Sequence, residues 1–201
     1  MSMNTVPTES LRDRKRRKTR ERIIETAFAL FAERGFDVVT VDEIAQRADI
    51  GRTTFFRYFG DKQEVVFSTE GDLLHALNTA MRTAPAEPLQ DLARALATSR
   101  RLLLVLCAEA SLNPGHHAVY YRLIKQHPDL EDRHTRKTRH YADLLEKHLI
   151  AHGAPLAIAV LAAQLTFACY QTAWRLGGDD AKAVLREANN AADLLLSATV
   201  S

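Results

Sequence analysis

The 201 residues allow one or two domains, and the net charge of +2 is nearly balanced. The basic N-terminus has no apolar run behind it, so we expect no secretory signal. Cys107 and Cys169 both lie in apolar surroundings. We expect them to be buried, reduced thiols of a cytoplasmic protein, without the close spacing of a redox pair.

Basic side chains are concentrated near the N-terminus. Residues 11–22 contain eight basic and two acidic side chains, whereas residues 63–201 contain 14 basic and 15 acidic ones. Such a run, after the Ser, Thr and Pro of the first ten residues, is typical of a disordered arm, which we place at residues 1–18. The arm can contact nucleic-acid phosphates or a minor groove, or it can serve only to keep the chain soluble.

A helix is predicted to begin at Val41. Thr40 can accept a hydrogen bond from the amide of Glu43, while Glu43 reaches back to the amide of Thr40, which together form a capping box. The apolar residues Val41, Ile44, Ala45 and Ala48 then share one face of this helix.

A second short helix is predicted to follow a tight turn. Residues 49–51 (Asp-Ile-Gly) fit the turn of a helix-turn-helix, and the next helix starts near Arg52. Phe55 and Phe59, four residues apart, anchor it. Its outer side carries Arg52, Thr53, Phe56, Arg57 and Tyr58. These side chains suit a DNA major groove, whereas an ordinary helical hairpin would carry Lys and Glu there.

Lys62 is predicted to lie at the start of the next helix. Gly60 ends the previous helix, and residues 61–64 (Asp-Lys-Gln-Glu) form a second capping box. Backbone amides and an ammonium group at one helix start can hold a phosphate, although a solvated lysine is the alternative.

In this order, these elements resemble the TetR-type (tetracycline-repressor) family of transcriptional regulators over about residues 19–66. The matched first helix ends at Gly35 and carries the apolar residues Ile23, Ile24, Ala27, Phe28 and Phe31. The resemblance implies base contacts from Arg52, Thr53, Phe56 and Arg57. It implies phosphate contacts from Thr40, Thr54, Tyr58 and Lys62.

Three residues depart from the commonest family pattern. Asp49 stands in place of Gly, Gly51 in place of Ser, and Phe56 in place of Tyr. Asp49 tolerates left-handed dihedrals, and Gly51 is an acceptable helix cap. Because Phe56 has no hydroxyl group, we expect it to act by apolar contact, which leaves more of the backbone anchoring to Arg57 and Tyr58.

The remaining chain is predicted to be helical, so the fold class is all-α. We expect helices near residues 62–81, 88–111, 116–126, 128–151, 154–176 and 180–198, separated by proline and glycine breaks that include Pro85 and Pro88. The domains are then a helix-turn-helix DNA-binding domain at residues 19–64 (the motif at about 40–59) and a helical domain at 65–201.

The stretch from Gly153 to Trp174 has no charged residue and raises the alternative of a transmembrane span. It is rich in Ala and carries Gln and Thr, so a buried helix explains it better. Val184, Ala188, Ala191, Ala192 and Leu195 form an apolar stripe on the following helix. By resemblance to the family, the last two helices would form a homodimer interface that places two recognition helices on a palindromic operator.

Aromatic residues of the second domain are candidate ligand contacts. Phe167, Tyr170 and Trp174 share one helix face, and Tyr120 and Tyr141 come from other helices. These residues can line a small-molecule pocket or form ordinary core. The resemblance implies that an effector bound there would release the protein from DNA.

We expect no enzyme activity, cofactor or metal. His148 and His152 have a metal-capable spacing, but no zinc-protease motif surrounds them, and no phosphate loop or nucleophile elbow occurs. The predicted function is that of an effector-controlled DNA-binding regulator, in particular a repressor. The alternative is a helical enzyme or adaptor that carries a helix-turn-helix.

Overall fold

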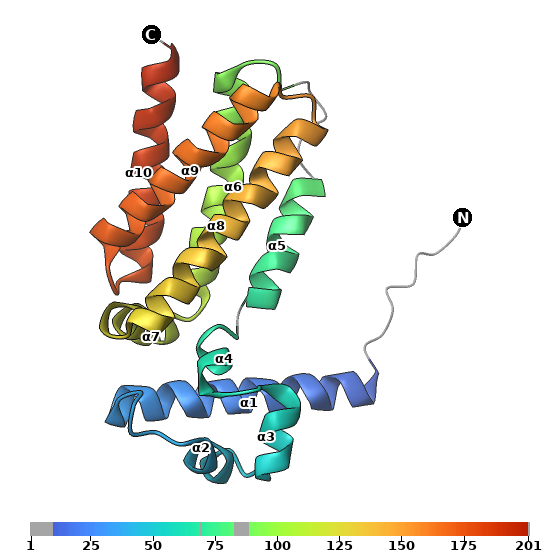
Figure 1. Cartoon of the computed structure of the whole chain (residues 1–201), viewed down its shortest axis with the longest axis vertical. Coiled ribbons are helices and arrows are strands. Elements are labelled where there is room, and N and C mark those ends of the chain that lie inside the picture. Colours follow the sequence, from blue (N-terminus) through green and yellow to red (C-terminus); the bar gives the residue numbers. More distant parts are fainter. Residues whose placement is uncertain (1–9, 69, 83–88, 201) are drawn as a thin grey trace. The chain divides into compact units, whose positions relative to one another are not determined.

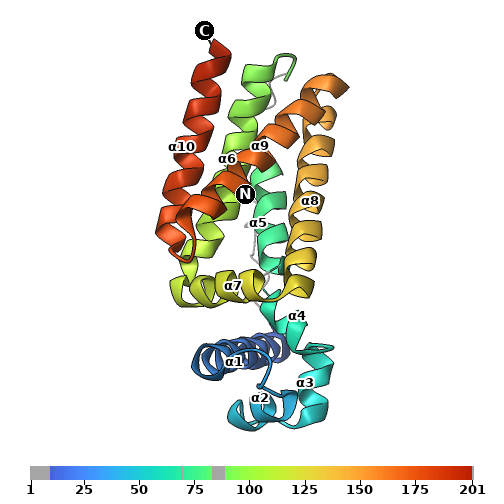
Figure 2. The same cartoon turned by 60° about the vertical axis from the view of Figure 1, so that its left-hand side comes forward.

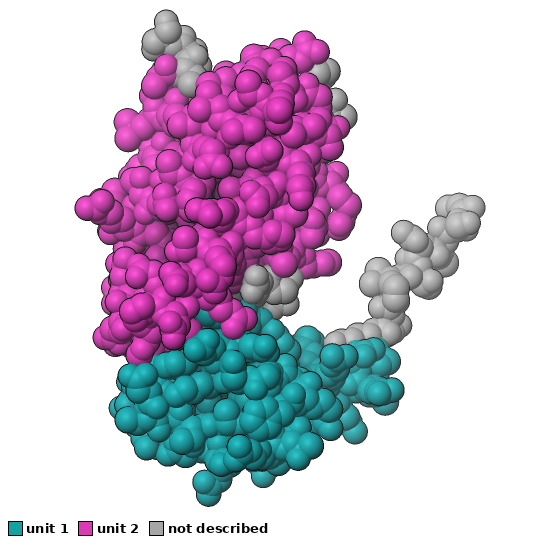
Figure 3. Space-filling view, viewed as in Figure 1, with its two compact units in different colours: residues 1–68 teal, residues 69–201 magenta. Residues whose placement is uncertain are grey.

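The computed structural model describes residues 10–68, 70–82 and 89–200, and every regular element in these ranges is an α-helix. The predicted all-α class is therefore confirmed. The chain divides into two compact units, Met1–Ser68 (unit 1) and Thr69–Ser201 (unit 2), which Figure 3 colours separately. The predicted break at Pro85 and Pro88 lies outside the described residues.

Unit 1 contains α1 (Leu11–Arg34), α2 (Val41–Arg47), α3 (Arg52–Tyr58) and α4 (Lys62–Val66). Within this unit, α2 and α3 lie on the same side of α1 in two views (Figures 1 and 2). Its core joins side chains from all four helices, among them Ile23, Phe28, Ile44, Phe55 and Val65. Burial of these side chains determines which face of each short helix points outward.

The first helix begins eight residues earlier than expected. The prediction of a disordered arm at residues 1–18 is wrong for residues 11–18, because α1 starts at Leu11. Ser10 caps this start by accepting a hydrogen bond from the amide of Asp13 at 3.1 Å, and Arg17 pairs with Glu21 one turn later. Arg and Lys also have high helix propensity, so a run of them extends a helix that is already anchored by its apolar half.

The helix-turn-helix has the predicted caps. The Thr40 hydroxyl accepts from the Glu43 amide at 3.2 Å, and a Glu43 carboxylate oxygen accepts from the Thr40 amide at 2.8 Å. Asp49 has a φ of 51°, the left-handed conformation that the sequence favoured for it. Gly51 is the N-cap of α3 and provides no side-chain hydrogen bond.

Hydrogen bonds to Glu43 also fix its charge. The backbone amide of Thr40, then Arg34 and the Thr40 hydroxyl, lower the pKa of Glu43 from 4.5 to about 2. The capping box therefore keeps its ionised carboxylate at neutral pH.

The ammonium group of Lys62 binds the loop between α1 and α2 within unit 1 rather than pointing into solvent. Its ammonium group donates to the carbonyl oxygens of Phe36 at 2.7 Å, Asp37 at 3.1 Å and Val39 at 3.0 Å. The Lys62 Nζ also lies 4.4 Å from the centre of the Phe36 ring. An ammonium group has three protons, so these carbonyls use its full donor capacity and fix the loop between α1 and α2.

The capping box at the start of α4 differs from the prediction. Asp61 accepts from the amide of Glu64 at 2.8 Å, as expected, but the Glu64 carboxylate accepts from Gly60 rather than from Asp61. The side chain of Glu64 therefore binds the residue that follows the C-cap of α3.

Unit 2 contains α5 (Glu70–Arg82), α6 (Leu92–Leu112), α7 (Pro114–Gln126), α8 (Pro128–Ala151), α9 (Leu156–Gly177) and α10 (Ala181–Val200). In Figures 1 and 2, α7 crosses one end of the bundle that the other helices form. The single helix expected at 62–81 is wrong, because α4 ends at Val66 and α5 starts at Glu70. An apolar pattern alone could not locate this interruption, since no Gly or Pro marks Phe67 or Ser68.

Helix α9 packs against α6, α8 and α10 and forms the centre of unit 2. Among the described residues, it is the one helix long and apolar enough to cross a membrane. Its buried side includes Ala159, Ala162, Ala163 and Ala173, which allow close packing of neighbouring helices. Length and composition alone are weak evidence for a span, and the core helix of a globular domain has the same properties.

Both cysteines agree with expectation. Cys107 and Cys169 are buried and unlinked, and burial raises the pKa of Cys107 to about 12. Each is therefore a protonated, unreactive thiol at neutral pH.

Lys62→Met removes the three hydrogen bonds from the ammonium group while keeping most of the side-chain volume. We expect unit 1 to lose roughly 1.5–3 kcal/mol of stability, because hydrogen bonds to a charged group are lost and partly buried carbonyls stay without that donor. Native-state hydrogen exchange of the full-length chain measures this loss at the amides of unit 1. Lys18→Met, at an exposed position of α1, is the control and should stay within about 0.5 kcal/mol. Unchanged protection in the Lys62 variant would contradict the structural role.

Candidate nucleic-acid interface and ligand cavity

The exposed face of α3 carries the side chains that the sequence predicted for base contact. Phe55 is fully buried and Phe59 is 4% exposed, so these two residues attach the helix to unit 1. The outer surface of the helix then presents Arg52, Thr53, Phe56 and Arg57, which are all exposed. Phe56 is 44% exposed, which is unusual for a phenylalanine that serves only to fill a core.

Two of these side chains are held in place before any partner binds. One Arg52 amino group donates to both carboxylate oxygens of Asp42, at 2.7 and 2.9 Å, and thereby links α3 to α2. The Arg52 guanidinium also lies 5.5 Å from the centre of the Phe56 ring. The remaining donors of Arg52 are on the other nitrogens of its planar group, where they can bind a base edge or a phosphate.

The predicted phosphate contacts differ in their availability. Thr40 is exposed at the cap of α2, whereas Thr54 and Tyr58 are half-buried on α3. The Arg57 guanidinium lies 5.6 Å from the centre of the Tyr58 ring, so these two side chains lie together at the C-terminal end of α3. Lys62 was predicted to contact a phosphate. In the structure its ammonium protons instead bond the carbonyls of the loop after α1.

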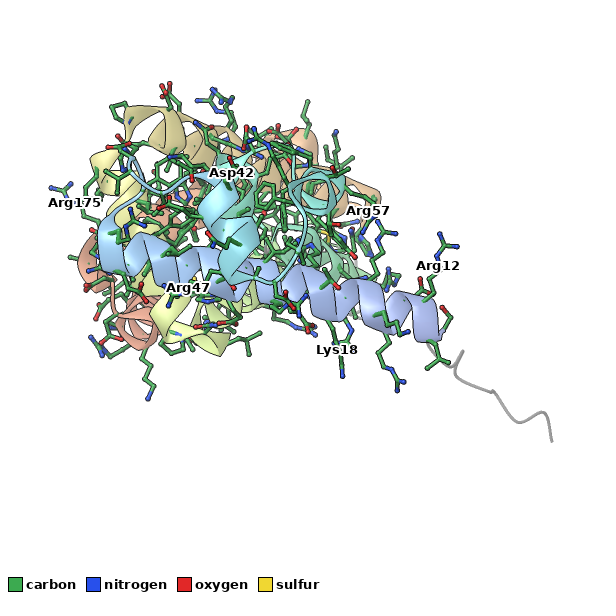
Figure 4. The ribbon with its side chains drawn as sticks, turned by 90° about the horizontal axis from the view of Figure 1, so that it is seen from below. Arg12, Lys18, Asp42, Arg47, Arg57 and Arg175 are labelled. Atoms are coloured by element: carbon green, nitrogen blue, oxygen red, sulfur yellow. The ribbon has the colours of Figure 1, made fainter. Side chains whose placement is uncertain are left out.

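The basic run divides into an exposed part and a structural part. Residues 12–18 are exposed along the N-terminal half of α1, and Figure 4 shows Arg12, Lys18 and Arg57 projecting outward from unit 1. Arg20 instead donates to the carbonyl of Ser68 and lies over the Phe59 ring at 5.5 Å. Arg22 donates to the carbonyl of Asp49 in the turn, at 3.4 Å.

Sequence reasoning missed three residues that shape this surface. Asp42 positions Arg52, while Arg20 and Arg22 hold Ser68 and the turn, respectively. The only signal for Asp42 was an acidic side chain in the first turn of a helix, which also suits the helix dipole. No sequence pattern distinguishes Arg20 and Arg22 from the other basic residues around them.

Unit 2 contains a cavity among α5, α6, α8 and α9. Its volume is about 30 Å³, which corresponds to about two water molecules. Three of the five predicted ligand residues line it, namely Tyr141, Phe167 and Tyr170. The other lining residues are mainly aliphatic: Leu77, Met81, Leu102, Leu103, Leu106, Ala142, Leu145 and Ala163, with Thr138 and Thr166.

Tyr120 and Trp174, the other two predicted ligand residues, do not line this cavity. They pack in an aromatic cluster around His134, whose ring centre lies 4.4 Å from that of Trp174. The Tyr120 hydroxyl is 2.9 Å from Nδ1 of His134. Burial, together with the positive charges of Lys137 and Lys125, lowers the pKa of His134 to about 4, so this histidine is neutral at pH 7.

Tyr170 connects the cluster to the cavity. Its ring centre lies 6.3 Å from that of Trp174, while the same residue belongs to the cavity lining. The shared helix face of Phe167, Tyr170 and Trp174 therefore covers two environments, because α7 and α8 cover the Trp174 end with their own aromatic side chains.

His148 and His152 stack on each other with ring centres 4.1 Å apart. Nδ1 of His152 is 2.8 Å from the backbone carbonyl of His148, and burial lowers the pKa of His148. Within the described part of the chain, no third His, Cys, Asp or Glu completes a group that could hold a metal ion.

Comparisons with known proteins agree with this geometry. Residues 23–69 match the family model described as bacterial regulatory proteins, tetR family. The chain is 30% identical over 146 residues to the transcriptional regulator TcmR of Streptomyces glaucescens, which covers 70% of this chain and 63% of that protein. The chain thus spans slightly less than two thirds of this relative's length.

Solved structures share the fold of nearly the whole chain. A SmeT–triclosan complex covers 90% of this chain and 91% of its own, with a TM-score of 0.63 and 20% identity. FadR of Bacillus subtilis in complex with stearoyl-CoA covers 88% and 97%, with a TM-score of 0.58 and 17% identity. The family match over residues 23–69 and the similarity to TcmR show that the helix-turn-helix part of this chain belongs to the tetR family of bacterial regulatory proteins, and the solved structures show that the chain shares their fold.

Proposed function

We propose that the chain is a homodimeric transcriptional repressor that binds a palindromic operator and is released from it by a small-molecule effector. The observation that carries the DNA-binding part is the exposed face of α3, with Arg52, Thr53, Phe56 and Arg57 on a helix fixed by Phe55. Such a helix fits a major groove, where arginine binds guanine and an apolar ring covers a thymine methyl. The relatives are transcriptional regulators, which favours this function over that of a helical enzyme or adaptor.

We assign DNA binding to residues 19–64 and effector binding and dimerisation to residues 65–201. Thr40, Thr54 and Tyr58 then bind phosphates around the base contacts, and the exposed basic half of α1 adds further phosphate contacts. Because the relatives are bacterial transcriptional regulators, we place the protein in the bacterial cytoplasm.

Dimerisation through the last two helices is supported by apolar side chains that unit 2 leaves exposed. Leu156, Val160, Leu161 and Leu176 on α9 and Leu194 on α10 are between 38% and 72% exposed. Most of the stripe that the sequence suggested for this interface is used within the protomer, since Val184, Ala188 and Ala192 are buried there. A two-fold dimer would present two recognition helices, as a palindromic operator with half-sites one DNA turn apart requires.

Effector control is supported by the cavity of unit 2 and by two relatives of the same fold. SmeT binds triclosan and Bacillus subtilis FadR binds stearoyl-CoA in the structures compared. An effector need only prefer the dimer geometry that does not fit DNA, and a coupling of about 1–3 kcal/mol changes operator affinity roughly 5- to 150-fold.

Arg57→Ala tests the reading surface. We expect operator binding to weaken by roughly 1–3 kcal/mol, because a bidentate or phosphate contact is lost at the interface. Fluorescence anisotropy with DNA from upstream of the protein's own gene measures the affinity. Arg139→Ala removes the same charge from an exposed position of unit 2 and should leave the affinity unchanged.

The same affinity measurement distinguishes the contribution of Phe56 to operator binding from that of Tyr58. Phe56→Ala should weaken binding through the loss of apolar contact, and Tyr58→Phe through the loss of a phosphate bond. Unchanged affinity in Phe56→Ala, together with abolished binding in Tyr58→Phe, would contradict the apolar contact assigned to Phe56.

Replacing Arg12, Arg14, Lys15 and Arg16 with Gln tests the basic half of α1 while keeping good helix formers. We expect the slope of log affinity against log salt to flatten by about 0.9 for each phosphate contact that is lost. A matched replacement of Arg133, Arg136, Lys137 and Arg139 on α8 controls for net charge. An unchanged slope in the α1 variant would leave this segment with only a solubilising role.

Leu161→Glu and Leu194→Glu test the dimer interface. Each places a charge in an apolar surface, so we expect dissociation to monomers in sedimentation equilibrium and loss of cooperative operator binding. Leu112→Glu, at an exposed leucine at the end of α6, should remain dimeric. Intact dimers in both interface variants would exclude α9 and α10 as the interface.

A further inference from the structure

The cavity of unit 2 is lined by uncharged residues. Of its thirteen lining residues, all of which lie in the described ranges, none is Asp, Glu, Lys, Arg or His. Its only polar side chains belong to Thr138, Thr166, Tyr141 and Tyr170. A charged ligand would lose its hydration there and gain no ion pair in return.

The two threonines use their hydroxyl protons within their own helices. Thr138 donates to the carbonyls of His134 and Thr135, at 3.0 Å each, and Thr166 donates to the carbonyl of Ala162 at 2.7 Å. Neither threonine therefore has a proton left to stabilise an anion in the cavity. Both oxygens keep a lone pair that can accept a hydrogen bond from a neutral donor.

Titratable groups around the cavity show that neither sign of charge is favoured in this region. Burial raises the pKa of Tyr170 well above its usual value and raises that of Cys107 to about 12, so anions are disfavoured. Burial also lowers the pKa of His134, which contacts Tyr170, to about 4. The buried groups Tyr170, Cys107 and His134 are thus all neutral at pH 7.

On the basis of the proposed effector function, we propose that the effector of this protein is an uncharged, mainly apolar molecule that binds in the cavity of unit 2. The aliphatic lining, the self-bonded threonines and the absence of charged residues from the described lining all select for such a ligand. Its polar groups would be limited to neutral donors or acceptors near the tyrosines and threonines.

The cavity must widen to admit this ligand, because its present space holds about two waters. Met81, Leu106 and Phe167 are the members of the lining best suited to move, since they are only partly buried. Methionine in particular is unbranched and adapts to irregular shapes. The bound ligand then packs against these side chains in place of the packing that they now make with one another.

Isothermal titration calorimetry of the full-length protein at pH 7 tests the chemical class with three probes of one shape. These are 1-naphthol, which is neutral, 1-naphthoate, which is an anion, and 1-naphthylmethylamine, which is a cation. We expect naphthol to bind at least about tenfold more tightly than either charged probe, because burying an unpaired charge is costly. Equal or tighter binding of a charged probe, or no binding of naphthol, would overturn the proposal.

Substitutions test the location. Ala163→Phe fills the cavity and should weaken naphthol binding at least about tenfold, whereas the same change at the exposed Ala108 should not. Leu106→Arg places a guanidinium at the partly exposed edge and should turn the preference toward naphthoate. Unchanged naphthol affinity in Ala163→Phe, with no gain for naphthoate in Leu106→Arg, would remove the ligand from this cavity.

A separate readout distinguishes the ligand from its effect. Trp174 is the only tryptophan of the chain and lies next to Tyr170, so its fluorescence reports binding independently of DNA. Naphthol that binds with the predicted selectivity but leaves operator affinity unchanged would overturn the proposed effector control. The chemical class of the cavity's ligand would remain supported by that result.

Discussion

The burial of Phe55 is the constraint on which the reading surface depends. A helix of seven residues has little stability of its own, so α3 exists because its apolar side chains are inserted into unit 1. Phe55 is fully buried and contacts the rings of Phe56 and Phe59, at centre distances of 5.6 and 5.9 Å. Because the side chains of Phe55 and Phe59 occupy the buried face, the helical repeat places Arg52, Phe56 and Arg57 on the outer face.

The basic side chains of unit 1 fall into two groups, one bonded to backbone carbonyls and one exposed on the surface. Lys62 and Arg20 bind backbone carbonyls that follow helices, where the negative end of the helix dipole and unpaired carbonyls favour positive charge. Arg12 and Lys18, by contrast, are exposed, and Arg52 is held at the surface by Asp42. The structural group organises loops, while the exposed group makes the surface of α1 and α3 strongly basic.

Unit 2 separates two functions on one helix. The buried side of α9 is built from alanines that bring α6, α8 and α10 close, and its aromatic residues border the cavity and the His134 cluster. Its exposed side retains leucines that a monomer gains nothing by exposing. Tyr170 lines the cavity and also contacts Trp174, so the cavity and the aromatic cluster are neighbours on one face of α9.

Local patterns in the sequence were enough to determine the helices and their ends in the helix-turn-helix. The Thr40–Glu43 capping box, the left-handed Asp49 and the anchoring pair Phe55 and Phe59 are interactions between residues at most four apart, and each appears as predicted. The same local rules also determined the all-α class, because apolar periodicity and breakers are properties of neighbouring residues.

Only the tertiary structure decided how individual side chains are used. Lys62 bonds residues 23 to 26 positions away, Arg20 bonds Ser68, and Tyr120 and Trp174 meet through His134 rather than around the cavity. Sequence spacing carries no information about such pairs, since their proximity results from the packing of separate helices. The sequence by itself therefore determined which helices form and which face of each is apolar, whereas long-range packing decided which cations and aromatic rings remain available for a ligand.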